Sequence, residues 1–276
     1  MHQIRYSVLT LLASSLFYLA GSVSQVEASI LSAGDIVRVD RDQGAVGFVG
    51  GEFSLYKRIG PGESDWEYVT KTFCLEYHAP IETGRDPITD QYYEYVVAAV
   101  SDRAISESAP NNPDYLSDEA KFLYYAYREG ILDTFDLGGG VYYEYNSGFW
   151  AQSLQNAIWT LEGEDSYDSY DQDLLINLAN TEAGNYLTEF DGTVLALNLF
   201  LKGTDLSGFD IDDPLTWDEN SSIANNHIQD MLWYAPVAAP VPEPATVAIW
   251  SLIGFGGLGL MAGRYRRQKS RQTHAT

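Results

Sequence analysis

The stretch Leu154-Gln155-Asn156-Ala157-Ile158-Trp159 lies inside a clear helical pattern. Ser147 is a typical N-cap residue, and Gly163 is a typical helix end. Between them apolar side chains recur at three- and four-residue steps, which predicts one buried face. These apolar positions are Trp150, Ala151, Leu154, Ala157, Ile158 and Leu161. Gln155 lies at the edge of this stripe, so the pattern predicts a helix that presents a carboxamide to a neighbouring sheet.

Cys74 is the only cysteine of the 276-residue chain. It lies in a segment, residues 66–78, whose alternation predicts a strand with Thr72, Cys74, Glu76 and His78 on one face. An odd cysteine is a buried inert thiol, half of an intermolecular disulfide, or a thiol committed to other chemistry.

The rest of the central chain reads as strands, then helices, then strands again. Helices are expected after the N-cap Ser117, ending at Gly130, and over residues 173–183. Further strands are expected over residues 36–39, 45–56, 92–100, 194–200 and 231–234. Strands that do not alternate with helices indicate an α+β fold rather than a parallel α/β fold.

The two ends indicate export. Residues 1–28 read as a signal peptide, because His2 and Arg5 precede an apolar run that ends before the small-residue site Val26-Glu27-Ala28. An N-terminal membrane anchor is the alternative, but the run is short for a span. Predicted boundaries are 1–28 for the signal peptide, 29–234 for the ectodomain, 235–244 for a Pro-rich linker, 245–263 for a transmembrane segment and 264–276 for a cytoplasmic tail.

The C-terminal end carries three features in order. Val241-Pro242-Glu243-Pro244 is followed by uncharged, mostly apolar residues 245–263, which are long enough to span a bilayer. Arg264, Arg266 and Arg267 then form a basic stop-transfer cluster that should stay cytoplasmic. Together these features resemble the PEP-CTERM sorting signal. The resemblance implies processing by an exosortase, a membrane transpeptidase, at the surface of a Gram-negative bacterium with an exopolysaccharide-rich envelope. An ordinary single-span anchor is the alternative.

The strongly negative net charge argues against anionic partners. The formal net charge is −23, and it becomes more negative without the two ends, which carry six basic residues and one acidic residue. Such a surface should repel nucleic acid and anionic membranes, and the sequence has no basic aromatic strip to bind either.

Phe73-Cys74, followed later by the helical Leu-Gln-x-Ala-Ile-Trp of residues 154–159, resembles the thioester domains of bacterial surface proteins. The resemblance implies a β-sandwich or barrel-like sheet with an inserted helical subdomain. It also implies a covalent bond between the Cys74 sulfur and the Gln155 side-chain carbonyl, formed with loss of ammonia. Such a protein attaches once to an amine or hydroxyl on a partner surface. It is not an enzyme and needs no cofactor.

Other functions remain as alternatives. The first is a non-covalent structural or exopolysaccharide-associated biofilm protein in which Cys74 is a free buried thiol. Cys74 and His78 could form part of a cysteine hydrolase, and Cys74 with His78 and His227 could bind zinc, although the spacing matches no usual ligand set. The many carboxylates make no particular glycosidase pair stand out. Two acidic groups could bind calcium but read better as solvated turns: Asp165, Asp168, Asp171 and Asp173, and Asp210, Asp212 and Asp213.

Overall fold

The computed structural model describes most of the chain between Leu31 and Ala235. The described residues are 31–42, 51–62, 64–79, 81–105, 114–164, 169–190, 193–213, 216 and 223–235. They belong to one compact unit that ends at Ala235. The predicted signal peptide, sorting motif, transmembrane segment and basic tail lie outside these residues. Among the described residues, no helix has the length and apolar character needed to cross a membrane.

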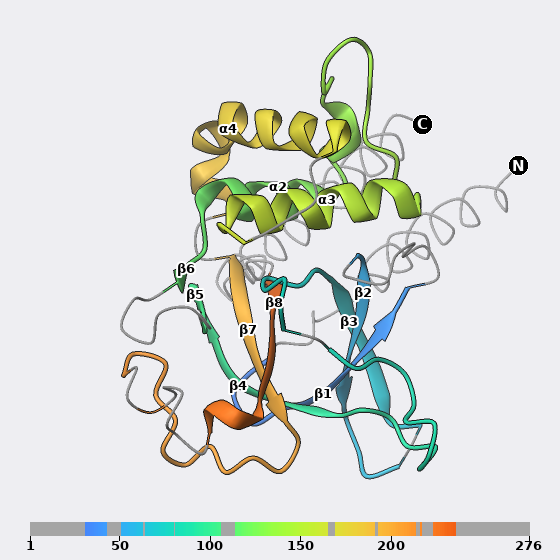
Figure 1. The fold of residues 1–276 in the computed structure, drawn as a ribbon, viewed down its shortest axis with the longest axis vertical. Coiled ribbons are helices and arrows are strands. Elements are labelled where there is room, and N and C mark those ends of the chain that lie inside the picture. Colours follow the sequence, from blue (N-terminus) through green and yellow to red (C-terminus); the bar gives the residue numbers. More distant parts are fainter. Residues whose placement is uncertain are drawn as a thin grey trace, which may run out of the picture. The chain divides into compact units, whose positions relative to one another are not determined.

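Six antiparallel strands form the main sheet, in the order β3-β2-β1-β4-β7-β8 (Figure 1). Their bounds are β1 (Ile36–Arg41), β2 (Phe53–Arg58), β3 (Trp66–Thr72), β4 (Tyr95–Ser101), β7 (Val194–Leu201) and β8 (His227–Tyr234). Two short strands, β5 (Arg103–Ala104) and β6 (Asp114–Tyr115), pair separately.

The residues that follow β3 join the first and last strands of this order. The Leu75 N–H donates to the Asp230 carbonyl at 2.8 Å, and the Leu232 N–H donates to the Phe73 carbonyl at 2.9 Å. Between them, Cys74 and Met231 form an antiparallel bridge. Because β3 and β8 are the two outer strands, these bonds close the sheet into a barrel and cover edges that would otherwise be unpaired.

Three helices are inserted between β4 and β7, and they lie as a layer across one end of the strands (Figure 1). They are α2 (Asp118–Arg128), α3 (Gly148–Leu161) and α4 (Tyr170–Phe190), with the 3₁₀ turn η1 (Leu132–Thr134) after α2. A further 3₁₀ turn, η3 (Ala224–Asn226), lies between β7 and β8. Ser117 and Ser147 cap α2 and α3 by accepting from the N–H groups of Ala120 and Trp150. Both predicted helix starts are therefore confirmed, whereas α4 is longer than the predicted 173–183.

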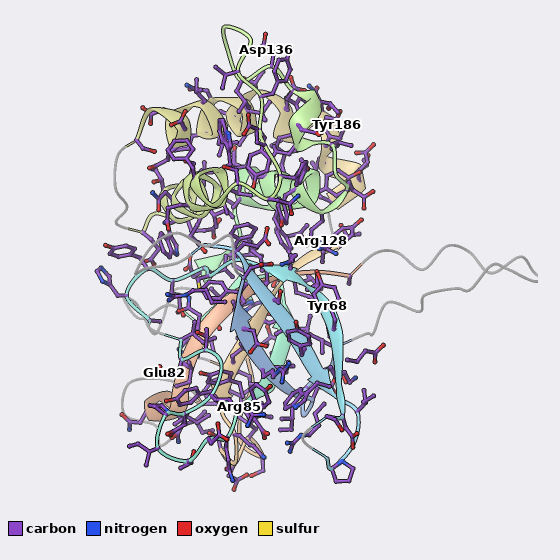
Figure 2. The ribbon with its side chains drawn as sticks, turned by 90° about the vertical axis from the view of Figure 1, so that its right-hand side faces the viewer. Tyr68, Glu82, Arg85, Arg128, Asp136 and Tyr186 are labelled. Atoms are coloured by element: carbon purple, nitrogen blue, oxygen red, sulfur yellow. The ribbon has the colours of Figure 1, made fainter. Side chains whose placement is uncertain are left out.

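The described residues form three buried apolar clusters, and two of them position the site. One lies inside the barrel and includes Val39, Leu55, Met231 and Trp233, together with Cys74. The other lies between the barrel and the helices, and includes Phe122, Leu154, Ile158 and the barrel residues Phe73 and Leu232. Figure 2 shows the helices and the strands from the side, with Asp136 and Tyr186 at the helical end and Glu82 and Arg85 at the opposite end.

The predicted α+β class and the inserted helices are confirmed, and the sheet is antiparallel. The predicted strand over residues 66–78 is too long, because β3 ends at Thr72. The chain there leaves its last β2 partner, Phe53, and turns to pair with β8. Regular alternation stops at that change of partner. The prediction that Thr72, Cys74, Glu76 and His78 share one face is therefore wrong: Cys74 is buried and His78 is exposed.

Candidate functional site

The side chain of Gln155 contacts the backbone of Cys74. The Cys74 N–H donates to Gln155 Oε1 at 2.9 Å, and Gln155 Nε2 donates to the Cys74 carbonyl at 2.7 Å. Gln155 is fully buried, deeper than the edge position that the sequence predicts. The two residues singled out in the sequence therefore meet, although they are separated by 81 positions.

The reason for this contact lies in the strand pairing. Phe73 and Leu75 direct their bonding groups to β8, so those of Cys74 point to the opposite side. The last residue pair between β2 and β3 is Phe53 with Thr72, so β2 does not pair with Cys74. The carboxamide of Gln155 has one donor and one acceptor side, like a peptide group, and it takes the place that a strand would have filled.

Helix α3 fixes the position of that carboxamide. Leu154, Ala157 and Ile158 pack in the core between helices and barrel, while Trp159 packs in the core inside the barrel with Cys74. Gln155 lies one helical turn before Trp159, so both residues share the face turned to the barrel. The ring of Tyr77 packs edge-on against Trp159, with 5.0 Å between the ring centroids.

The thiol of Cys74 is almost completely buried, with 4% of the residue exposed. Burial raises its pKa far above the ordinary value, and the negative charge of Glu76 raises the pKa further, whereas Arg41 acts in the opposite direction. Cys74 is therefore a neutral thiol at physiological pH. Its surroundings are unlike those of the exposed, electropositive sites where free thiols are reactive.

Glu76, His227 and Asp230 form a polar cluster beside this site. His227 Nε2 lies 3.0 Å from Asp230 Oδ1 and 3.9 Å from Glu76 Oε2, and the three ligand-type atoms lie within 4.8 Å of one another. The same carboxylates also accept hydrogen bonds from backbone N–H groups. Asp230 accepts from the Ile105 N–H, and Glu76 accepts from the Asp230 N–H at 3.0 Å. The cluster therefore helps to close the barrel. Sequence patterns did not indicate this cluster, because Glu76 is 154 positions from Asp230 in the chain.

The alternatives raised from the sequence find little geometric support. The ring of exposed His78 packs on Tyr77 rather than beside Cys74, so the proposed Cys–His pair is not assembled. Asp171 and Asp173 lie in the first turn of α4, while Asp165 and Asp168 lie outside the described residues. Asp210 accepts from the Asp212 N–H in an exposed turn, as expected for a solvated acidic loop.

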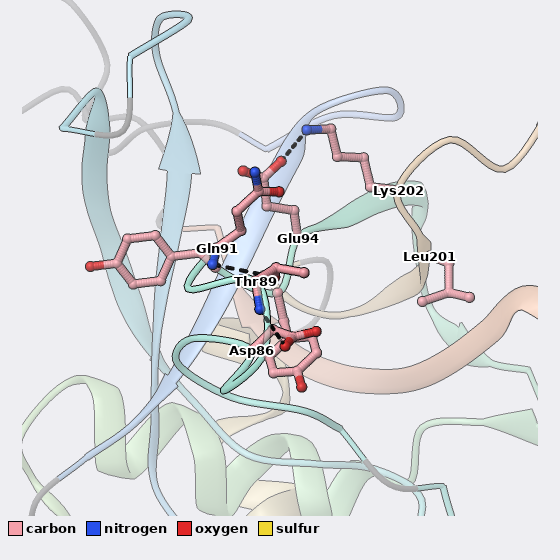
Figure 3. A pocket seen from close by; sticks show the side chains of 8 residues that line it. Asp86, Thr89, Gln91, Glu94, Leu201 and Lys202 are labelled. Atoms are coloured by element: carbon pink, nitrogen blue, oxygen red, sulfur yellow. Dashed lines mark hydrogen bonds and ion pairs between the residues drawn. The ribbon is translucent and has the colours of Figure 1, made fainter.

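An open pocket of about 350 Å³ lies where β4 begins and β7 ends (Figure 3). Glu94 pairs there with Lys202 and, at 2.5 Å, with Arg58. The backbone N–H groups of Ile88 and Thr89 donate to Asp86 and lower the pKa of that carboxyl. The remaining lining residues are Gln91, Tyr92, Tyr93 and Leu201. The pocket is polar: Glu94 and Lys202 pair with each other, and Asp86 accepts from backbone N–H groups.

Comparison with known proteins identifies the C-terminal signal. Residues 240–267 match the PEP-CTERM protein-sorting motif. The chain is therefore an exported protein that is anchored to the membrane before an exosortase processes it. No curated protein and no solved structure matches the chain.

Proposed function

We propose that the ectodomain stores an internal thioester between Cys74 and Gln155 and uses it once, to attach covalently to a partner outside the cell. The observation that carries the proposal is the pair of hydrogen bonds between the Gln155 carboxamide and the Cys74 backbone, at 2.9 and 2.7 Å. The sorting motif supports it, because an exported protein meets surface or matrix nucleophiles.

The geometry suggests how the bond forms. The Cys74 sulfur attacks the Gln155 side-chain carbonyl carbon, the carbon–nitrogen bond breaks, and ammonia leaves with the proton of the thiol. Negative charge develops on Oε1 during the attack, and the Cys74 N–H already donates to that oxygen. Amides are poor electrophiles, so fixed placement of both groups must supply much of the barrier reduction.

The burial of Cys74 and Gln155 favours the survival of a thioester once it has formed. Water has little access to a site in which Gln155 is fully buried and Cys74 nearly so. The environment that raises the pKa of the Cys74 thiol also makes its thiolate a poor leaving group. Both effects slow hydrolysis. Reaction requires a partner amine or hydroxyl to reach the Gln155 carbonyl, which releases the Cys74 thiol and leaves the protein attached. The reaction is stoichiometric, so the protein is not an enzyme.

One observation favours a second candidate. The same two hydrogen bonds satisfy the buried backbone of Cys74, which a purely structural role would also require. In that case the protein is a non-covalent matrix or exopolysaccharide-associated component, and Cys74 is an inert core thiol.

Mass spectrometry of the freshly purified chain, never exposed to amines, separates the two candidates. The thioester predicts a mass lower by one ammonia than the sequence requires, and the full mass in both Cys74→Ala and Gln155→Ala. Methylamine should then add at Gln155 and expose one alkylatable thiol. A full mass in the native protein, with a Cys74 thiol that is alkylated after denaturation, would rule out the covalent function and leave the structural one.

A further inference from the structure

A second group of reactive side chains lies on the outer face of the barrel, below α2. Lys71 belongs to β3, Glu52 immediately precedes β2, and Asp42 immediately follows β1. The register places Lys71 opposite Ser54, and the Asp42 N–H donates to the Glu52 carbonyl. The three residues therefore come from three neighbouring strands and lie at the helix-covered end of the barrel.

Their side chains converge on the Lys71 amine. Lys71 Nζ is in contact with the carboxylate of Asp42, 2.9 Å from Glu52 Oε1 and 3.1 Å from Ser54 Oγ. The hydroxyl of Tyr127, on α2, donates to the other oxygen of Glu52. The amine thus lies between two carboxyl groups, and the Glu52 carboxyl also accepts a hydrogen bond from the buried Tyr127.

The surroundings favour the uncharged forms of two of these groups. Burial lowers the pKa of the Lys71 amine, and the positive charge of Arg128 lowers it further. Burial raises the pKa of Glu52, although its bond with Tyr127 and the charge of Arg128 act in the opposite direction. Arg128 and Tyr68 are labelled at this junction in Figure 2. A neutral amine is a nucleophile, and a neutral carboxylic acid can donate a proton.

We propose that Lys71 and Asp42 join through an intramolecular amide bond, with Glu52 carrying the protons. The Lys71 nitrogen attacks the Asp42 side-chain carbonyl carbon. Neutral Glu52 donates its own proton to the departing oxygen of Asp42, then takes a proton from the attacking nitrogen and delivers it to the same oxygen, so that Glu52 ends as a carboxylate. One nitrogen–carbon bond forms, one carbon–oxygen bond breaks, and one water leaves. No oxidant, metal or cofactor is required.

Such a bond would link β3 to β1 across β2, close to the segment that holds Cys74. It would cross-link the part of the barrel that bears the force when a covalently attached partner pulls on the domain. The inference does not depend on the thioester, because different residues form the bond and a different small molecule leaves.

Peptide mapping of the purified full chain tests the bond directly. The chain is first treated with methylamine, which opens a thioester but leaves an amide intact. Trypsin does not cut after an acylated lysine, so the amide predicts one product in which residues 42–57 are joined to residues 59–85, lighter by one water than the separate peptides. A free peptide that ends at Lys71 in the native protein would overturn the proposal.

Variants test the roles of the three residues. Lys71→Arg keeps the positive charge but should abolish the joined product, and circular dichroism shows whether that variant folds. Glu52→Gln keeps the shape and hydrogen-bonding capacity but cannot carry the proton, so the joined product should fall at least tenfold. Asp42→Asn should still yield it, by loss of ammonia. An undiminished product in Glu52→Gln would overturn the role given to Glu52.

Discussion

The two ends of the barrel differ in how deeply their polar contacts are buried. At the helix-covered end, the Gln155 carboxamide and the Cys74 backbone are buried and bonded to each other. At the open end, Glu94 pairs with Lys202 on the rim of a pocket, and about half of the Lys202 side chain is exposed. Both contacts join segments far apart in sequence, but only the first is shielded from water.

This difference in burial decides which contacts stabilise the fold and which could protect a reactive bond from water. A buried polar group that loses its partner costs its full desolvation free energy, whereas an exposed ion pair exchanges its partner for water. Removal of water also protects an acyl bond from hydrolysis and strengthens the dipoles that act on it. The helix-covered end is therefore the place to test for both stability and reactivity.

The largest effect is expected from Gln155→Ala in a Cys74→Ala background, where no thioester can form. The change leaves the N–H and carbonyl of residue 74 buried without their partner, so the free energy of unfolding should fall by about 4 kcal/mol. Urea unfolding measures the difference. Gln152→Ala on the same helix, whose side chain bonds Asn156 at a half-buried position, is the matched control and should cost about 1 kcal/mol. Equal effects of the two changes would contradict the comparison.

A smaller effect is expected from pH at the same end. Burial raises the pKa of Glu162 from 4.5 to about 7, against the two hydrogen bonds that Ser117 donates to it. The folded chain thus holds this proton more tightly than the unfolded chain. The stabilisation is complete below pH 4.5 and is lost as the pH rises towards 7.

The loss should amount to about 2 kcal/mol, after allowance for the partial solvent contact of Glu162. Urea unfolding at several pH values between 4 and 8 measures it. Glu162→Gln retains an oxygen that can accept from Ser117, and its pH profile should be flatter by the same amount. A profile unchanged by the substitution would assign the pH dependence to other carboxyls.

The smallest effect is expected at the open end. Lys202→Ala removes a half-exposed ion pair with Glu94, so the free energy of unfolding should change by less than about 0.5 kcal/mol. Thermal unfolding at low and at high salt measures the change, which should shrink further as salt rises. A loss above about 1 kcal/mol would show that this end is as strongly held as the helix-covered end.

Local sequence patterns predicted the helices better than they predicted the closure of the sheet. Ser117 and Ser147 cap their helices as expected, because capping and apolar periodicity act within one or two turns. The strand through Cys74 was predicted too long, because its end depends on β8, whose residues come much later in the chain. Alternation within residues 66–78 carries no information about that exchange of partners.

The candidate sites divide in the same way. The positions of Cys74 and Gln155 could be singled out from the sequence by motif resemblance, and in the structure the Gln155 carboxamide contacts the Cys74 backbone. The thioester between their side chains stays a prediction. The Glu76, His227 and Asp230 cluster and the Lys71, Asp42 and Glu52 group could not be found in this way. Acidic residues are so abundant in this chain that no pair of them is distinctive before the strands are placed side by side.

By itself the sequence determined the α+β class, the starts of α2 and α3, and the export and sorting signal, because each depends on short-range pattern or composition. Only the tertiary structure decided that the chain after β3 pairs with β8, that the Gln155 carboxamide occupies the vacant side of Cys74, and that Lys71 meets two carboxyl groups. These contacts form because burial leaves each backbone and side-chain polar group to find a partner among whatever the packing brings near it.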